Sequence, residues 1–144
     1  MEKSKKLKLF LVDDDAMYLR LLEIEFLQHT EFAVVTFATG ELCINHLPSK
    51  PDIIVLDYHL DGIEVNAMNG ITVLQKIKSF NPKIPVIMLS AQDKIEVAIN
   101  CMHNKAYDYV VKNETAFMRL QKIIQRIHEF EKVEKELNWY MNRM

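Results

Sequence analysis

The sequence predicts an α/β fold in which helices cover both faces of a parallel sheet. The first observation is that five short apolar runs alternate with segments of helical periodicity, without a repeat or a Gly/Ser linker. The second is that the central run, Ile53 to Leu56, is apolar at every position, which is typical of a strand buried on both faces. Right-handed crossovers then place every strand's carboxyl end at one edge of the sheet, where such folds bind ligands.

The composition is that of one globular domain of 144 residues, with 49% hydrophobic and 26% charged residues. A formal net charge of −2 creates no strong field toward nucleic acid or an anionic membrane, so we expect neither as a direct partner. No apolar run is long enough to span a bilayer, and the basic N-terminus lacks the apolar stretch of a signal peptide. Cys43 and Cys101 have no metal-binding spacing, so we expect free thiols and a cytoplasmic location.

Three strands and two helices are predicted in the first half of the chain. Runs of β-branched and aromatic residues mark the strands. Asp15 and Thr39 have side chains that cap helices, and Pro48 is expected to halt the second helix, because an interior proline loses a backbone hydrogen bond. The predicted elements are the strands 7–12, 32–37 and 52–57, a helix that fades near residue 29, and a helix over 41–47.

Three helices and two strands are predicted after the polar loop 58–69. Gly70 opens a helix that Asn81 and Pro82 close, and Pro85 stands near the start of the next strand, where proline is tolerated. Asn113 or Thr115 caps the last helix, which runs almost to the end of the chain. The other predicted elements are the strands 84–89 and 106–111 and a helix from about 93 to 104.

Four of the predicted strands end in polar side chains. Asp13 and Asp14 follow the first strand, Asp57 ends the third, Ser90 follows the fourth and Lys112 follows the fifth. A charge at the end of a buried strand is costly unless it finds a partner. If the strands are parallel, these acids, the hydroxyl and the ammonium meet at one edge of the sheet.

This set of side chains suits phosphoryl transfer. Carboxylates without His or Cys favour a hard cation, first of all Mg²⁺, which also relieves the repulsion among them. A carboxylate can act as the nucleophile toward phosphorus. Lys112 would then neutralise negative charge on one oxygen of the transferred group, and the Ser90 hydroxyl would donate a hydrogen bond to another. The residues therefore predict a Mg²⁺-dependent phosphoryl site at Asp57.

Four motifs, each at a strand end, occur between Leu7 and about Ile127. They are Leu11-Val12-Asp13-Asp14-Asp15, Val55-Leu56-Asp57, Val86-Ile87-Met88-Leu89-Ser90-Ala91 and Asp108-Tyr109-Val110-Val111-Lys112. With these motifs in this order, the chain resembles the receiver domain of two-component response regulators. The resemblance implies a flavodoxin-like fold with five strands in the order 2-1-3-4-5. It also implies a signalling module rather than a turnover enzyme, with a sensor histidine kinase or phosphotransfer protein as partner.

The resemblance also implies a role for each residue of the site. Asp57 would accept the phosphoryl group from a phosphohistidine. Asp14 would bind Mg²⁺ directly, Asp13 directly or through water, Asp57 through its carboxylate and His59 through its backbone carbonyl.

The remaining site residues would respond to phosphorylation of Asp57. Lys112 would contact the phosphoryl group, and Ser90 would be the switch hydroxyl that moves toward it. Tyr109 matches the aromatic switch that turns inward at the same time. The result would be a shift in population that remodels the face formed by the fourth helix, the fifth strand and the fifth helix.

Three departures from the family pattern stand out. The loop 61–69 is about five residues longer by our alignment, with Asp61 in place of a proline; it is either a surface insertion or a segment for partner contact. Asn113 follows Lys112 where the family has proline after a cis bond, so we expect a trans bond or a strained cis bond. His59 is either a bystander or a group that titrates near neutrality.

The chain is predicted to divide into a receiver domain, 1–128, and a C-terminal helical extension, 129–144. Apolar residues continue at three- and four-residue spacing into the extension, with Glu134 as one polar position. The extension either frays, forms a dimer helix, or links to an effector domain absent from this sequence. The seam consists of Leu120, Ile123, Ile127, Phe130, Glu134, Leu137 and Met141.

Two other functions are compatible with these residues. The first is a pseudo-receiver that serves as a protein-interaction scaffold without phosphorylation, motivated by the long loop and by Asn113. The second is an aspartyl-phosphate hydrolase, although such enzymes often place an acid where His59 stands. The three aspartates could also merely cap helices, but that does not explain Ser90 and Lys112.

Overall fold

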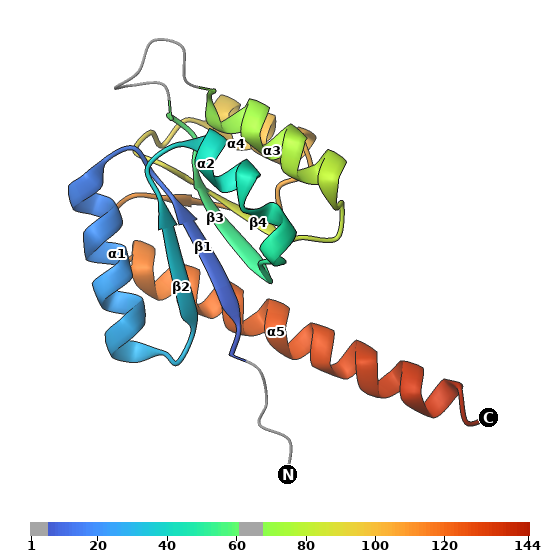
Figure 1. The fold of residues 1–144 in the computed structure, drawn as a ribbon. Coiled ribbons are helices and arrows are strands. Elements are labelled where there is room, and N and C mark those ends of the chain that lie inside the picture. The colour runs from blue at the N-terminus through green and yellow to red at the C-terminus, as the bar shows by residue number, and fades with distance from the viewer. Residues whose placement is uncertain (1–5, 61–67) are drawn as a thin grey trace.

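The computed structural model describes residues 6–60 and 68–144 and contains a five-stranded parallel sheet between two layers of helices (Figure 1). The strand order is β2-β1-β3-β4-β5, so the predicted fold class and strand order are confirmed. Within the described ranges, no helix has the length and hydropathy needed to cross a membrane. The strands are β1 (Lys8–Val12), β2 (Ala33–Phe37), β3 (Ile53–Asp57), β4 (Val86–Ser90) and β5 (Asp108–Val111).

Helices α1 and α5 pack on one face of the sheet and α2, α3 and α4 on the other (Figure 1). Every residue of β3 is buried, and its side chains alternate between the two layers. Ile54 and Leu56 pack with α2, α3 and α4, whereas Ile53 and Val55 pack with α1 and α5. The helices are α1 (Ala16–His29), α2 (Gly40–Asn45), α3 (Gly70–Phe80), α4 (Ile95–His103) and α5 (Ala116–Met141), with a 3₁₀ turn at Leu47–Ser49.

The boundary predicted for α2 was wrong. The helix ends at Asn45 rather than at Leu47, and a separate 3₁₀ turn that contains Pro48 follows it. The first backbone N–H groups of a helical turn have no partner within the turn, so a proline there costs no hydrogen bond. Lys50 then ends the turn with a left-handed φ of 62°.

Helix α4 starts at Ile95, two residues later than predicted, and only part of its apolar surface faces the core. Val97 and Cys101 are buried. Ile95, Ile99 and Met102 are exposed by 73%, 59% and 48% and form an outer apolar face. Because this helix has apolar residues on both faces, the sequence alone could not show which face packs on the sheet.

Helix α5 continues without a break from Ala116 to Met141. Thr115 occupies its N-cap position, while Asn113 accepts a hydrogen bond from the Thr115 N–H at 3.0 Å. The Lys112–Asn113 peptide bond is trans, which was one of the two expected alternatives. Residues up to Ile127 pack on the sheet, and the helix then projects beyond it (Figure 1).

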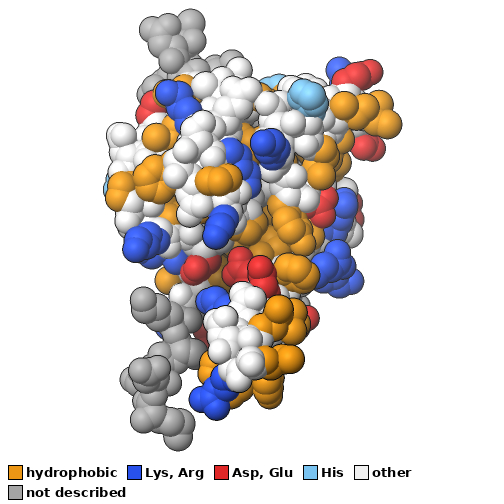
Figure 2. All heavy atoms as spheres, turned by 90° about the vertical axis from the view of Figure 1, so that its right-hand side faces the viewer, with side chains coloured by type: hydrophobic (Ala, Val, Ile, Leu, Met, Phe, Trp, Pro, Cys, Tyr) orange, Lys and Arg blue, Asp and Glu red, His pale blue; other side chains and the backbone are white. Residues whose placement is uncertain are grey.

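The projecting part of α5 has large apolar side chains in solvent. Figure 2 shows apolar side chains along one side of this end of the helix. Their exposed fractions are 68% for Phe130, 61% for Val133, 56% for Leu137 and 61% for Met141.

Gly70 is the position where α3 approaches the end of β3. A Cβ on Gly70 would lie 2.4 Å from the Asp57 carbonyl oxygen and 2.7 Å from the Tyr58 Cα, and neither backbone atom can move aside easily. We expect Gly70→Ala to lower the free energy of unfolding by about 2 kcal/mol in urea denaturation, despite alanine's better helix propensity. Lys76→Ala, on the exposed side of the same helix, should change it by less than about 0.5 kcal/mol. Equal stability of the two variants would contradict the predicted clash.

Candidate functional site

Three carboxylates meet at the carboxyl edge of the sheet. Asp13 follows β1 and Asp57 ends β3, its neighbour in the sheet. One oxygen from each of Asp13, Asp14 and Asp57 lies within 4.8 Å of the others. Asp13 and Asp57 are only 1% and 3% exposed, so the cluster is a buried concentration of negative charge. The sequence predicted this cluster from the strand ends alone.

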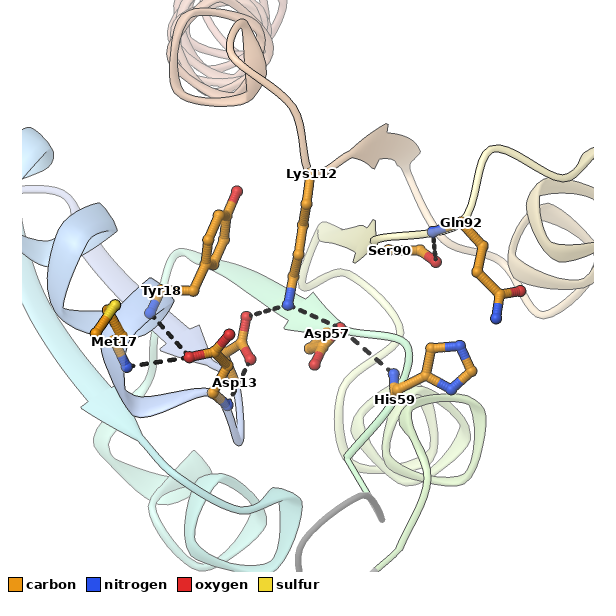
Figure 3. Close-up of polar contacts among 9 residues, drawn as sticks. Asp13, Met17, Tyr18, Asp57, His59, Ser90, Gln92 and Lys112 are labelled. Atoms are coloured by element: carbon orange, nitrogen blue, oxygen red, sulfur yellow. Dashed lines mark hydrogen bonds and ion pairs between the residues drawn. The ribbon is translucent and has the colours of Figure 1, made fainter.

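The turn after β1 holds Asp13 in place. The Asp13 N–H donates to the Phe37 carbonyl at 3.1 Å, and its Oδ1 accepts from the Asp15 N–H at 2.9 Å. Asp15 caps α1 as predicted, because its Oδ1 accepts from the N–H groups of Met17 and Tyr18. Hydrogen bonds therefore link the end of β1 to the start of α1 beside the site (Figure 3).

Lys112 reaches into the cluster from the end of β5. Its Nζ lies 2.7 Å from Asp13 Oδ2 and 3.4 Å from Asp57 Oδ1 (Figure 3). Its backbone N–H donates to the Ser90 carbonyl at 2.8 Å, which ties the end of β5 to β4. The side chain is only 13% exposed, so both ion pairs are largely shielded from water. The prediction that Lys112 meets Asp57 is confirmed in the structure.

Burial and charge shift the pKa values of the site. Burial raises the pKa of Asp57 to about 7, the negative charge of Asp13 adds to this effect, and the positive charge of Lys112 opposes it. Burial alone would lower the pKa of Lys112, but its contacts with Asp13 and Asp57 outweigh burial and raise it. One ammonium thus faces several carboxylates, and the site lacks positive charge.

The cluster suits a small divalent cation. Its donors are carboxylate oxygens alone, which hard ions such as Mg²⁺ prefer. Oδ2 of Asp13 is buried, and its contact with Lys112 is an ion pair rather than an aligned hydrogen bond, so this oxygen retains capacity for a cation. A cation here would also favour the ionised form of Asp57. The donors and their burial therefore fit a metal site.

Ser90 and Tyr109 meet at the peptide groups of Gln92 rather than at Asp57. The Ser90 Oγ accepts from the Gln92 N–H at 3.0 Å, and the Tyr109 hydroxyl donates to the Gln92 carbonyl. Ser90 is fully buried at the end of β4, next to Leu89, whose register partner is Asp57. The loop between β4 and α4 is therefore held at Gln92 by both predicted switch residues.

The segment after Asp57 is described only in part. The His59 N–H donates to Asp57 Oδ1 at 3.4 Å, while its ring packs against the Tyr58 ring at 4.9 Å between centroids. The metal role of the His59 carbonyl stays a prediction. Residues 61–67 of the predicted insertion, including Asp61, lie outside the described residues. The insertion's last part is anchored, because Glu41 Oε1 accepts from the Met68 N–H at 2.8 Å.

Two contributors to the site were not predicted from the sequence. The Tyr18 ring lies against Lys112, with Nζ 4.6 Å from the ring centroid. Gln92 links Ser90 to Tyr109 through its backbone. The position of Tyr18, three residues after the helix cap Asp15, was the one signal that could have placed it near the cluster.

The chain matches a known family over most of its length. The sequence profile described as "Response regulator receiver domain" matches residues 9–127. A protein-glutamate methylesterase/protein-glutamine glutaminase from Clostridium acetobutylicum is 32% identical over 117 residues, which cover 78% of this chain and 32% of that protein. The chain spans about a quarter to a third of the length of the curated relatives it matches.

Solved structures agree with the fold. A CheY-like receiver domain protein from Methanospirillum hungatei JF-1 matches with a TM-score of 0.75 at 22% identity, over 89% of this chain and 98% of that one. The BeF3-activated receiver domain of DrrB, from Thermotoga maritima, matches with a TM-score of 0.71 at 27% identity, over 87% and 99% of the two chains.

The raised pKa of Asp57 predicts a pH dependence of stability without divalent cations. The folded-state pKa of about 7 exceeds the usual value of 3.8, so the folded protein binds this proton more tightly than the unfolded chain does. The contribution of Asp57 to stability should therefore decline as pH rises from about 4 to about 7. We expect Asp57→Asn to be more stable than the wild type at pH 8, on the order of 2 kcal/mol, with a smaller difference at pH 5.

Urea denaturation with a chelator between pH 5 and 8 measures this difference. Asp93→Asn, which changes an exposed carboxylate, should follow the wild-type pH profile. Added Mg²⁺ should stabilise the wild type more than Asp57→Asn at pH 8. A constant difference between wild type and Asp57→Asn across this pH range would show that the pKa of Asp57 is not raised.

Proposed function

The chain belongs to the response regulator receiver family, and on this premise we propose that it is a phosphoacceptor module of a two-component or phosphorelay pathway. One observation carries the proposal most directly. The Asp57 carboxylate ends the central strand inside the acidic cluster, with the Lys112 ammonium 3.4 Å away. A nucleophile, a cation site and a positive side chain are thus present together, as phosphoryl transfer requires.

In the proposed reaction, an Asp57 oxygen attacks the phosphorus of a phosphohistidine on a sensor histidine kinase or phosphotransfer protein. The new O–P bond forms as the P–N bond breaks, and the departing imidazole takes up a proton. Lys112 stabilises the negative oxygens of the transferred group. Asp13, Asp14 and the His59 carbonyl would hold Mg²⁺ together with Asp57. A bound Mg²⁺ would neutralise charge on the same oxygens.

We assign the response to phosphorylation to the contacts at Gln92. The Ser90 hydroxyl now accepts a hydrogen bond from the Gln92 N–H, but a phosphoryl group on Asp57 would offer it a charged acceptor. Movement of Ser90 would free the Gln92 N–H, and Tyr109, which donates to the Gln92 carbonyl, would respond. The population of loop conformations shifts, and with it the outer face of α4, β5 and α5.

Uptake of phosphate from a small donor tests this proposal. With acetyl phosphate and Mg²⁺, intact-mass spectrometry should show one phosphate adduct on the wild type and none on Asp57→Asn. Asp52→Asn, just before the opposite end of the same strand, should still form the adduct. An adduct that persists in Asp57→Asn, or its absence in the wild type, would contradict the assignment.

The alternative is a pseudo-receiver that acts only as an interaction scaffold. It is favoured by the Asn113 substitution and the longer loop after Asp57. It predicts no adduct with any phosphodonor and partner binding that Asp57→Asn leaves unchanged. Beryllofluoride with Mg²⁺ separates the two functions, since only a phosphoacceptor should bind it and shift the amide signals of Ser90 and Tyr109.

We also propose that the extension, 129–144, serves in protein contact, either as a dimer helix or as a link to an effector domain. Exposed apolar residues on a continuous helix support this proposal, because a projecting helix of this length is marginal without a partner. For a dimer helix, light scattering should show a mass that rises with concentration and that Leu137→Glu reduces to the monomer. Lys132→Glu, a charge change of the same kind on an exposed polar position, should leave the wild-type behaviour intact. A monomer at every concentration would exclude the dimer helix.

A further inference from the structure

The Lys112 ammonium has an aromatic neighbour as well as its two carboxylates. Tyr18 lies on the first turn of α1, and the ammonium sits 4.6 Å from its ring centroid (Figure 3). At this distance a cation over a ring face is attracted to the π-electrons. The ring therefore forms one wall around the ammonium, while Asp13 and Asp57 form another.

We propose that Tyr18 is a positioning residue, whose ring holds the Lys112 ammonium within reach of Asp57 and of the group that Asp57 accepts. The inference rests on the proposed function, because the use of Lys112 is to stabilise a transferred phosphoryl group. It adds a residue from α1 to a site that the sequence motifs build only from strand ends.

The position of the Tyr18 ring is fixed independently of Lys112. Asp15 caps α1 and accepts a hydrogen bond from the Tyr18 backbone N–H at 3.2 Å. The Tyr18 side chain also packs against the core cluster under α1 and α5. Because backbone and ring are both held, the ring can define where the flexible lysine side chain stops.

The ring offers a kind of contact that the carboxylates do not. When Asp57 becomes phosphorylated, Lys112 must move from the Asp57 carboxylate to a phosphoryl oxygen. Carboxylate contacts are directional, whereas the ring face attracts the ammonium over a broad surface. Lys112 can therefore follow the charge while it remains against Tyr18.

The ring rather than the hydroxyl makes this contact. In Figure 3 the Tyr18 hydroxyl points away from the ammonium and from Asp13. Burial raises the pKa of Tyr18 to about 12, with the charges of Asp13 and Asp57 adding to the effect, so the phenol stays neutral. Phenylalanine should therefore replace tyrosine in this role, and leucine should not.

The first test examines the contact itself, without metal or phosphate. Protons above an aromatic ring resonate upfield, so the ε-protons of Lys112 should be shifted upfield in protein with labelled lysine. Lys112→Met identifies their signal. We expect the shift to persist in Tyr18→Phe and to vanish in Tyr18→Leu. Met17→Leu, on the same turn at a position 75% exposed, is the matched control and should keep the shift.

The second test measures the consequence for phosphoryl transfer. With acetyl phosphate and Mg²⁺, Tyr18→Leu should form the Asp57 adduct about five- to tenfold more slowly than the wild type, the effect expected for a shielded cation–π contact. Tyr18→Phe and Met17→Leu should stay within about twofold of the wild-type rate. Thermal unfolding confirms that each variant is folded before the rates are compared.

The outcomes separate this inference from the proposed function. A folded Tyr18→Leu variant with wild-type Lys112 signals and a wild-type rate would overturn the positioning role. A loss in Tyr18→Phe as large as in Tyr18→Leu would overturn it too, because the hydroxyl would then be the active group. If the wild type takes up no phosphate, the proposed function fails, while the Lys112 proton shifts still decide whether the ring holds the ammonium.

Discussion

The ion pairs of Lys112 with Asp13 and Asp57 are the interaction on which the site depends. Burying several carboxylates at one strand edge is unfavourable, and one ammonium offsets only part of that cost. Burial, with the negative charge of Asp13 added to it, raises the pKa of Asp57 to about 7, and the site stays short of positive charge. A site built in this way favours a divalent cation, and it is poised to respond when its charge changes.

Asp57 and the two predicted switch residues are held by different kinds of structure. Asp57 is held by a strand whose five residues are all buried, and Gly70 lets α3 pack directly against the end of that strand. Ser90 and Tyr109 instead meet on the backbone of Gln92, in a loop with no regular structure of its own. In the proposed function, the end of the buried strand would carry the phosphoryl group, and the loop at Gln92 would transmit the change of charge to the outer face.

The sequence predicted what depends on strand ends, and it failed where contacts depend on the third dimension. Runs such as Ile53 to Leu56 and the polar groups after them placed Asp13, Asp57 and Lys112 correctly, because parallel topology brings all strand ends to one edge. Tyr18 was missed because its contact joins α1 to the end of β5, and no periodicity encodes such a crossing. The predictions for residues 61–67 of the insertion are untested, since these residues lie outside the described ranges.

The surface of α5 indicates where the packed domain ends. Up to Ile127 the helix turns apolar residues toward the sheet, and the positions that continue this face are Phe130, Glu131 and Glu134. All three line a groove together with Lys78, Lys83 and Lys105, so charged side chains join apolar ones there. Phe130 and Leu137 continue the apolar seam of this helix and are more than half exposed. An apolar seam that continues past the packed part of the helix, on side chains that stay largely in solvent, supports the proposal that the extension contacts a partner.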